Sequence, residues 1–144
     1  MSAAPQPPPK FRAVAPGAVR IDGETWGDAL IGGRCRRCGT VTFTQRAICP
    51  SCWQADTQEP VELSRRGTFY AHTIVRNPPP GAAGPYAIAY VDLPEKLRIM
   101  VRSDLETVAH VAPGMEVAIA IAPIGTDEDG ATLLGPVLRR AEAA

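Results

Sequence analysis

The sequence predicts a mainly β protein in two parts, a short cysteine-rich ribbon followed by a five-stranded barrel. Two observations support this fold class. All four cysteines of the 144-residue chain fall in two Cys-x2-Cys pairs separated by ten residues. Beyond residue 60, short runs of alternating apolar and polar residues are separated by turn residues, a pattern typical of small antiparallel β folds. The length suits one ordinary domain or two very small ones.

The cysteine pairs, Cys35 with Cys38 and Cys49 with Cys52, indicate a metal site. A tetrahedral ion needs four soft ligands that converge, and a two-residue gap lets both sulfurs of a pair face the same side. Gly39 follows the first pair, where the backbone often takes positive φ. Trp53 follows the second pair and suits that conformation less well. We expect a structural zinc ion on four thiolates, although a single iron ion also suits this ligand set.

Other uses of the cysteines fit the sequence less well. Disulfides need an oxidising compartment, and the first thirty residues contain no apolar signal segment. A redox Cys-x-x-Cys is expected within a βαβ pattern, which neither pair shows. A catalytic zinc keeps one coordination position open, whereas four thiolates fill all of them.

Charge and hydropathy limit the possible partners. Fifteen basic and fifteen acidic side chains cancel, so no long-range field attracts nucleic acid or an anionic membrane. Apolar runs are too short to span a bilayer. With reduced thiols and no targeting segment, we expect a cytoplasmic protein.

The chain divides into three expected segments. Residues 1–17 are rich in proline and alanine, lack a helical or strand period, and predict a flexible tail. Residues 18–57 contain a short helical segment and the zinc ribbon. Residues 58–144 form the barrel. The ribbon has almost no apolar core, so the metal is expected to supply its folding energy.

Local patterns place the elements before the barrel. The helical turn is expected at 22–30, with Trp26 as a local anchor, although Gly23 and Gly27 weaken it by roughly 1 kcal/mol each. Alternation at 40–44 predicts the short hairpin of the ribbon. Residues 58–63 are expected to form a linker.

The barrel strands follow from alternation and turn signals. Within the first strand, Phe69, Ala71, Thr73 and Val75 are expected on one face, and Tyr70, His72 and Ile74 on the other. The connector after the third strand suggests one helical turn capped by Asp104. Five strands with this longer insertion suggest a Greek-key barrel of the OB type. The strands are predicted at 67–76, 86–93, 97–102, 115–124 and 132–139.

The fourth predicted strand is apolar on both faces. Val117, Ile119 and Ile121 form one face, and three alanines form the other. Such a strand is covered on both sides. The cover is either the ribbon, a terminal segment or another chain.

Several motifs occur along the chain in a specific order and spacing. They are Arg34-Cys35-Arg36-Arg37-Cys38-Gly39, Phe43 to Arg46, Cys49-Pro50-Ser51-Cys52, Pro78 to Pro80 with Pro85-Tyr86, Val91-Asp92-Leu93 and Pro113-Gly114-Met115. In this order they resemble the DUF35 family of small acyl-CoA-associated proteins, over about residues 25–140. Two departures stand out: Thr44-Gln45 replaces residues that are commonly prolines, and Trp53 follows the last cysteine.

The resemblance implies a rubredoxin-like zinc ribbon followed by an OB fold, working as an accessory subunit. Members look like partners of thiolase-like proteins, including thiolases, acyltransferases and retro-aldolases, and some associate with hydratase-like domains. The partner holds the catalytic residues. The barrel is expected to help admit or hold a CoA thioester, so a hetero-oligomer is implied.

The residues themselves offer no catalytic set. The two histidines, His72 in a strand and His110 in a connector, lie outside any nucleophile or metal motif. All four cysteines are used by the ribbon, and no nucleophile elbow or glycine-rich phosphate loop is present.

Six residues are candidates for binding a ligand or partner. Pro79 and Pro80 stiffen a loop that ends at Tyr86, an amphipathic contact residue. The alternative is an ordinary hairpin loop. Arg36, Arg37 and Arg46 near the ribbon suit CoA phosphates or partner carboxylates, although most surface arginines are only solvated.

Three functions remain open at the level of sequence. The leading hypothesis is a non-catalytic zinc-ribbon and OB-fold subunit that supports a thiolase-like acyl-CoA enzyme. The alternative is a single-stranded nucleic-acid-binding OB-fold protein. The neutral net charge makes this alternative less favourable, because such proteins need a basic surface. A third is an enzyme acting alone on an acyl thioester through His72 or Tyr86, for which no dyad is evident.

Overall fold

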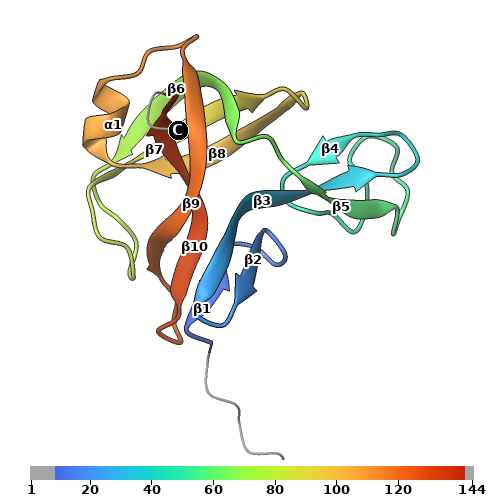
Figure 1. Ribbon diagram of the computed structural model, residues 1–144, viewed down its shortest axis with the longest axis horizontal. Helices are drawn as coiled ribbons and strands as arrows, with labels where there is room; N and C mark the ends of the chain where they lie inside the picture. Colours follow the sequence, from blue (N-terminus) through green and yellow to red (C-terminus); the bar gives the residue numbers. More distant parts are fainter. Residues whose placement is uncertain (1–8, 142–144) are drawn as a thin grey trace, which may run out of the picture.

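Five strands close into a barrel in the C-terminal part of the chain (Figure 1). The computed structural model describes residues 9–141. Around the barrel the order is β10-β8-β7-β6-β9, and β9 pairs with β10 to close it. β8 and β10 run parallel and meet at Arg102 and Val137. The predicted OB-type barrel is confirmed. Its strands are β6 (Arg66–Val75), β7 (Tyr86–Leu93), β8 (Leu97–Ser103), β9 (Glu116–Thr126) and β10 (Thr132–Arg140).

The helical turn predicted between the third and fourth barrel strands is also present. Helix α1 (Leu105–Ala109) starts after Asp104, whose carboxylate accepts a hydrogen bond of 2.7 Å from the Thr107 backbone N–H. This bond holds the pKa of Asp104 below its usual value. Val108 is buried in the barrel core. None of the helices in residues 9–141 has the length and apolar character needed to cross a membrane.

A bulge in β6 changes which side chains face the core. Pairing with β7 shifts between Phe69 and Ala71, so Ala71 lies opposite the exposed Tyr90 and His72 lies opposite the buried Ala89. Cross-strand partners share a face of the sheet. The faces predicted for residues beyond Tyr70 are therefore wrong, because strict alternation does not anticipate an extra residue.

The segment before the ribbon is β structure. Strand β2 (Val19–Asp22) pairs antiparallel with β3 (Thr25–Cys35), so the helical turn expected at 22–30 is wrong. The hairpin turn consists of Gly23 and Glu24, and Gly23 has φ of 62°. Glycine at the first position of a two-residue hairpin turn supplies positive φ without strain, and the strand pairing that it permits outweighs the helical spacing of Trp26 and Leu30.

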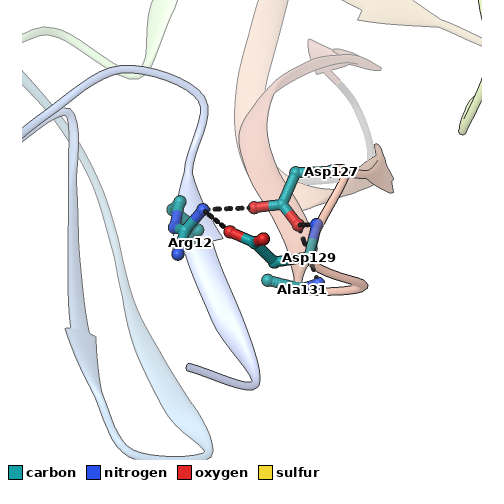
Figure 2. A network of polar contacts seen from close by, with 4 residues as sticks. All are labelled: Arg12, Asp127, Asp129 and Ala131. Carbon is teal, nitrogen blue, oxygen red and sulfur yellow. Dashed lines mark hydrogen bonds and ion pairs between the residues drawn. The ribbon is translucent and has the colours of Figure 1, made fainter. Parts of the chain in front are cut away.

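Part of the expected tail is also ordered against the barrel. Strand β1 (Phe11–Ala13) pairs parallel with β10, while residues 1–8 lie outside the described residues. Figure 2 shows how Arg12 reaches the turn between β9 and β10. Its guanidinium lies 2.6 Å from Asp127 and 3.2 Å from Asp129. Asp127 also accepts hydrogen bonds from the backbone N–H groups of Asp129 and Ala131, which fixes the turn.

The N-terminal strands cover one end of β9, which answers the question of what packs on that strand there. The rings of Phe11 and Trp26 lie 5.1 Å apart and pack with Ile121. The indole N–H of Trp26 donates to the Ile121 carbonyl at 3.4 Å. Trp26 is therefore the local anchor that the sequence predicts, and cover comes from within the chain.

Strand β3 continues from this hairpin into the ribbon (Figure 1). Its second half pairs with β4 (Val41–Thr42) and β5 (Gln58–Glu62). Strand β4 confirms the predicted hairpin, whereas the expected linker at 58–63 is largely a strand. The ribbon is attached to the barrel by apolar packing, because Leu30 and Leu63 belong to the barrel core cluster.

A glycine at the start of β6 allows two strands to approach closely. A Cβ on Gly67 would lie 2.5 Å from the Asp92 carbonyl oxygen and 2.7 Å from Val91 Cγ1. We predict that Gly67→Ala lowers the free energy of unfolding by about 1–3 kcal/mol, measured by urea denaturation. Gly27→Ala is the control, since its Cβ meets nothing nearer than 3.6 Å. Equal stability of the two variants would contradict the prediction.

Candidate metal centre and partner surface

The four cysteine sulfurs converge on one point. All four lie within 4.8 Å of one another, with Cys35 to Cys52 at 3.7 Å and Cys38 to Cys49 at 3.6 Å. Ligands on a tetrahedral zinc with bonds of about 2.3 Å stand about 3.8 Å apart, whereas a disulfide is about 2.05 Å long. The four free thiols therefore fit a tetrahedral metal ion, as the sequence predicts.

Each Cys pair sits on a tight turn that aims both sulfurs inward. The N–H of Gly39 donates to the Cys35 carbonyl, and the N–H of Trp53 donates to the Cys49 carbonyl, each at 2.9 Å. Both residues after a pair have positive φ, 79° for Gly39 and 61° for Trp53. Glycine adopts this conformation freely, but it costs other residues roughly 1–2 kcal/mol. Trp53 therefore carries backbone strain that Gly39 avoids.

Neighbouring polar groups prepare two of the thiols for ionisation. The Thr57 hydroxyl, 3.2 Å from Cys35 Sγ, together with the Cys38 backbone, lowers the pKa of Cys35 to about 6. The Thr40 hydroxyl lowers the pKa of Cys38 in the same way. For Cys52, the Gln54 backbone lowers the pKa, but burial and the adjacent thiols outweigh it and raise the pKa to about 11. A bound cation would supply the charge that removes the remaining protons.

The centre is suited to holding structure. With four protein thiolates, a tetrahedral ion has no open position for water or substrate. Cys35 ends β3 and Cys49 is fully buried, so a metal here ties the ribbon sheet to both turns. Within residues 9–141, this is the one cluster of potential ligands that meets metal-site geometry.

The three candidate arginines lie in two different environments. Arg36 donates to the backbone carbonyls of Asp56, at 3.0 Å, and Thr57, at 3.3 Å, while Arg37 reaches the Gln54 side chain at 3.5 Å. These two are engaged within the ribbon. Arg46 instead lines a hollow between ribbon and barrel.

The proline loop differs in part from the expectation. Pro79 and Pro80 are exposed, but the middle of the loop is held at the β9–β10 end, where the Thr126 N–H donates to the Gly81 carbonyl at 2.9 Å. Tyr86 is only 9% exposed and lies beneath the Arg102 guanidinium, 3.7 Å from the ring centroid. Tyr86 therefore does not present the open contact surface that the sequence suggests.

A groove that sequence reasoning missed runs between the ribbon and the outer face of β7 and β8. We call it the ribbon–barrel groove, and its volume is about 540 Å³. The alternation of β8, which places Arg98, Met100 and Arg102 on one face, was the signal available for it. The packing of the ribbon beside that face could not be predicted from the sequence. The groove is lined chiefly by Phe43, Arg46, Ile88, Tyr90, Met100 and Arg102.

Of the three arginines that line the groove, one is paired with a carboxylate. Arg98 makes two contacts with the Asp92 carboxylate, at 2.7 and 3.2 Å, and stacks on Tyr70. This contact lowers the pKa of Asp92. Arg102 donates to the Ile124 carbonyl at 2.9 Å. Among the described residues, neither Arg46 nor Arg102 has a carboxylate partner, so two positive charges border an apolar floor.

The histidines have local contacts. The His72 ring lies 5.9 Å from the Phe69 ring, and His110 Nδ1 lies 2.8 Å from the Glu106 carbonyl. Neither residue lines the metal centre or the ribbon–barrel groove.

Together, a four-thiol ribbon and a closed five-stranded barrel define a zinc-ribbon and OB-fold protein. Two family models match in the same order: the ChsH2 rubredoxin-like zinc ribbon domain over residues 28–58, and the ChsH2 C-terminal OB-fold domain over residues 60–122. The chain belongs to the DUF35 family, as its motifs indicate.

Named relatives cover most of the chain. It is 36% identical over 116 residues to the benzoylsuccinyl-CoA thiolase subunit BbsA of Thauera aromatica, covering 77% of this chain and 76% of the relative. It is 38% identical over 110 residues to a DUF35 domain-containing scaffold protein of Pyrococcus furiosus, covering 74% and 79%. The solved Ltp2-ChsH2(DUF35) aldolase is similar with a TM-score of 0.61 and 28% identity, covering 78% of this chain and 85% of that one.

Substitution of a single cysteine tests the four-thiolate site. Cys38→Ser and Cys52→Ser should each lose the bound metal, because three thiolates hold it far less tightly, and the fold of residues 30–56 should be lost with it. Elemental analysis and amide hydrogen exchange measure these two effects. Ser51→Ala, between two ligands but not itself one, is the control and should retain metal. Equal metal content in all three variants would rule out the four-thiolate site.

Proposed function

We propose that this chain is a non-catalytic accessory subunit of a thiolase-like acyl-CoA enzyme, with zinc as its structural metal. BbsA and the Ltp2-ChsH2(DUF35) aldolase support this, since the first is named as a thiolase subunit and the second pairs a DUF35 domain with an aldolase. The proposed reaction, whether thiolase, acyltransferase or retro-aldolase chemistry, belongs to the partner. The four free thiols suit a reducing compartment, and we propose the cytoplasm.

The observation that carries the proposal is the ribbon–barrel groove. A CoA thioester combines phosphates with an apolar pantetheine and acyl chain, so its recognition needs cations beside an apolar surface. Arg46 and Arg102 supply cations without carboxylate partners among the described residues, and guanidinium groups bind phosphate in a bidentate manner. Tyr90 and Met100 are exposed on the groove floor and offer apolar and stacking contact.

The remaining candidate residues are assigned to the partner. Pro79 and Pro80 are exposed on a loop that is held at its middle, so it presents a stiff surface at low entropic cost. Arg36 and Arg37 retain exposed surface on the ribbon while their guanidinium groups bond within it. We propose these four residues as contacts with the thiolase-like subunit.

Single-stranded nucleic acid is the competing ligand, because OB folds commonly bind it on the corresponding strands. Tyr70, Tyr90 and Met100 are exposed there. The balanced net charge and the neutralisation of Arg98 by Asp92 favour a smaller anion. Salt-dependent binding of a single-stranded oligonucleotide at micromolar protein would favour the alternative.

Co-expression with a thiolase-like subunit tests the proposed function. We expect the two chains to elute together in gel filtration, and thioester turnover by the partner to depend on this chain. Metal analysis should find zinc. Independent elution together with full activity of the partner alone would refute the proposal, and iron would correct the metal.

Groove variants test the shared ligand. In the reconstituted complex, Arg46→Ala or Tyr90→Ala should raise the KM for the acyl-CoA about 10-fold, equivalent to about 1.4 kcal/mol of lost binding. Arg65→Ala is the control, because Arg65 forms an exposed ion pair with Asp28 and does not line the groove. Unchanged KM values in both groove variants would exclude the groove as the CoA site.

A further inference from the structure

Trp53 stands out among the residues that the proposed function leaves unexplained. Its side chain is 77% exposed, and Ile48, which directly precedes Cys49, is 54% exposed. Pro50 lies between them and is also exposed. We call Ile48, Pro50 and Trp53 the knuckle surface. It borders a hollow of about 380 Å³ that Phe43 and Leu97 also line.

The energetics of Trp53 are unfavourable in the isolated chain. The indole is largely in water, and its backbone holds φ of 61°, a conformation that Gly39 supplies without strain at the matching position of the first pair. Isolated surface hydrophobics are ordinary, but a cluster of them on a strained turn points to a function. Shielding of the metal does not explain the indole, because a side chain so exposed covers little.

Charge around the knuckle surface indicates the chemistry of its partner. Between residues 34 and 57 the chain carries four arginines and one aspartate. Arg46 lines the same hollow as Trp53, and Arg37 contacts Gln54 next to it. An apolar anchor with an arginine rim suits an apolar pocket bordered by carboxylates, since aromatic and arginine side chains dominate protein interfaces.

We infer that the knuckle surface is the docking anchor of this chain, with Trp53 inserted into an apolar, acid-rimmed pocket of the thiolase-like subunit. The inference rests on the proposed function and assigns the surface that carries it. Arg46 and Phe43 line both the knuckle hollow and the ribbon–barrel groove. A partner seated on Trp53 therefore closes one side of the groove.

The test uses the thiolase-like subunit that co-purifies with the wild-type full-length chain from its native host, identified by mass spectrometry. Trp53→Gly removes the indole and relieves the backbone strain, so metal content and the midpoint of thermal unfolding should be retained or improved. Its affinity for the purified subunit should fall at least 10-fold. Binding should shift tryptophan emission of the wild type to shorter wavelength, and this shift should be absent in Trp53→Gly.

Leu105→Ala is the matched control, because Leu105 is an exposed apolar residue on α1, on the opposite side of the molecule from the ribbon (Figure 1). It should bind like the wild type. Wild-type affinity of Trp53→Gly, or equal weakening by both variants, would overturn the inference while leaving the proposed function intact. If no thiolase-like subunit co-purifies, the proposed function fails and this inference fails with it.

Discussion

The convergence of four thiols is the constraint on which the ribbon depends. Its turns carry exposed and charged residues and few that are buried, so hydrophobic burial cannot order them. The thiol cluster replaces that missing core, with Thr57 and Thr40 hydroxyls favouring two of the thiolates before any ion binds. Once the sulfurs are held together, the turns present Ile48, Trp53 and Arg46 in fixed positions. In the proposed docking role, the metal centre fixes the position of the knuckle surface.

Strand β3 transmits this order to the barrel. Its first half is held by β2 beside the Phe11 and Trp26 cluster, and its second half is the central strand of the ribbon sheet. Leu30 and Leu63 insert into the barrel core, so the ribbon is packed on the barrel as well as connected to it. The ribbon–barrel groove exists because of this packing. The proposed ligand and partner surfaces consequently meet at Arg46, which lines both hollows.

Much of the fold could be predicted because local patterns carry it. Apolar and polar residues alternate along barrel strands of seven or more residues between clear turns, and Asp104 is a recognisable N-cap for α1. Strands β1 and β5 were not predicted, because each is short and depends on pairing with a strand distant in sequence. Strand β1 pairs with β10, and β5 pairs with β3. The β6 bulge has no local signal either. In each of these places, tertiary pairing overrides the sequence pattern.

The same distinction applies to the site. Four cysteines at fixed spacing specify a ligand set directly, and the sulfurs lie where the spacing requires. The groove depends on two parts of the chain meeting, so the alternation that places Met100 and Arg102 on one face of β8 does not show that the ribbon packs beside that face. The burial of Tyr86 beneath Arg102 likewise depends on tertiary packing. The misfit of Trp53 was visible in the sequence. Its positive φ and exposure give that misfit a physical meaning.

Amide hydrogen exchange tests the account most directly, because it maps the contact surface of this chain in the intact complex. Exchange is compared for the chain alone, for its complex with the thiolase-like subunit, and for that complex with acyl-CoA. The account predicts slowed exchange at residues 43–53 on complex formation and further slowing at 86–102 when acyl-CoA is added. Unchanged exchange at both segments in the presence of a thiolase-like subunit that binds elsewhere would contradict it.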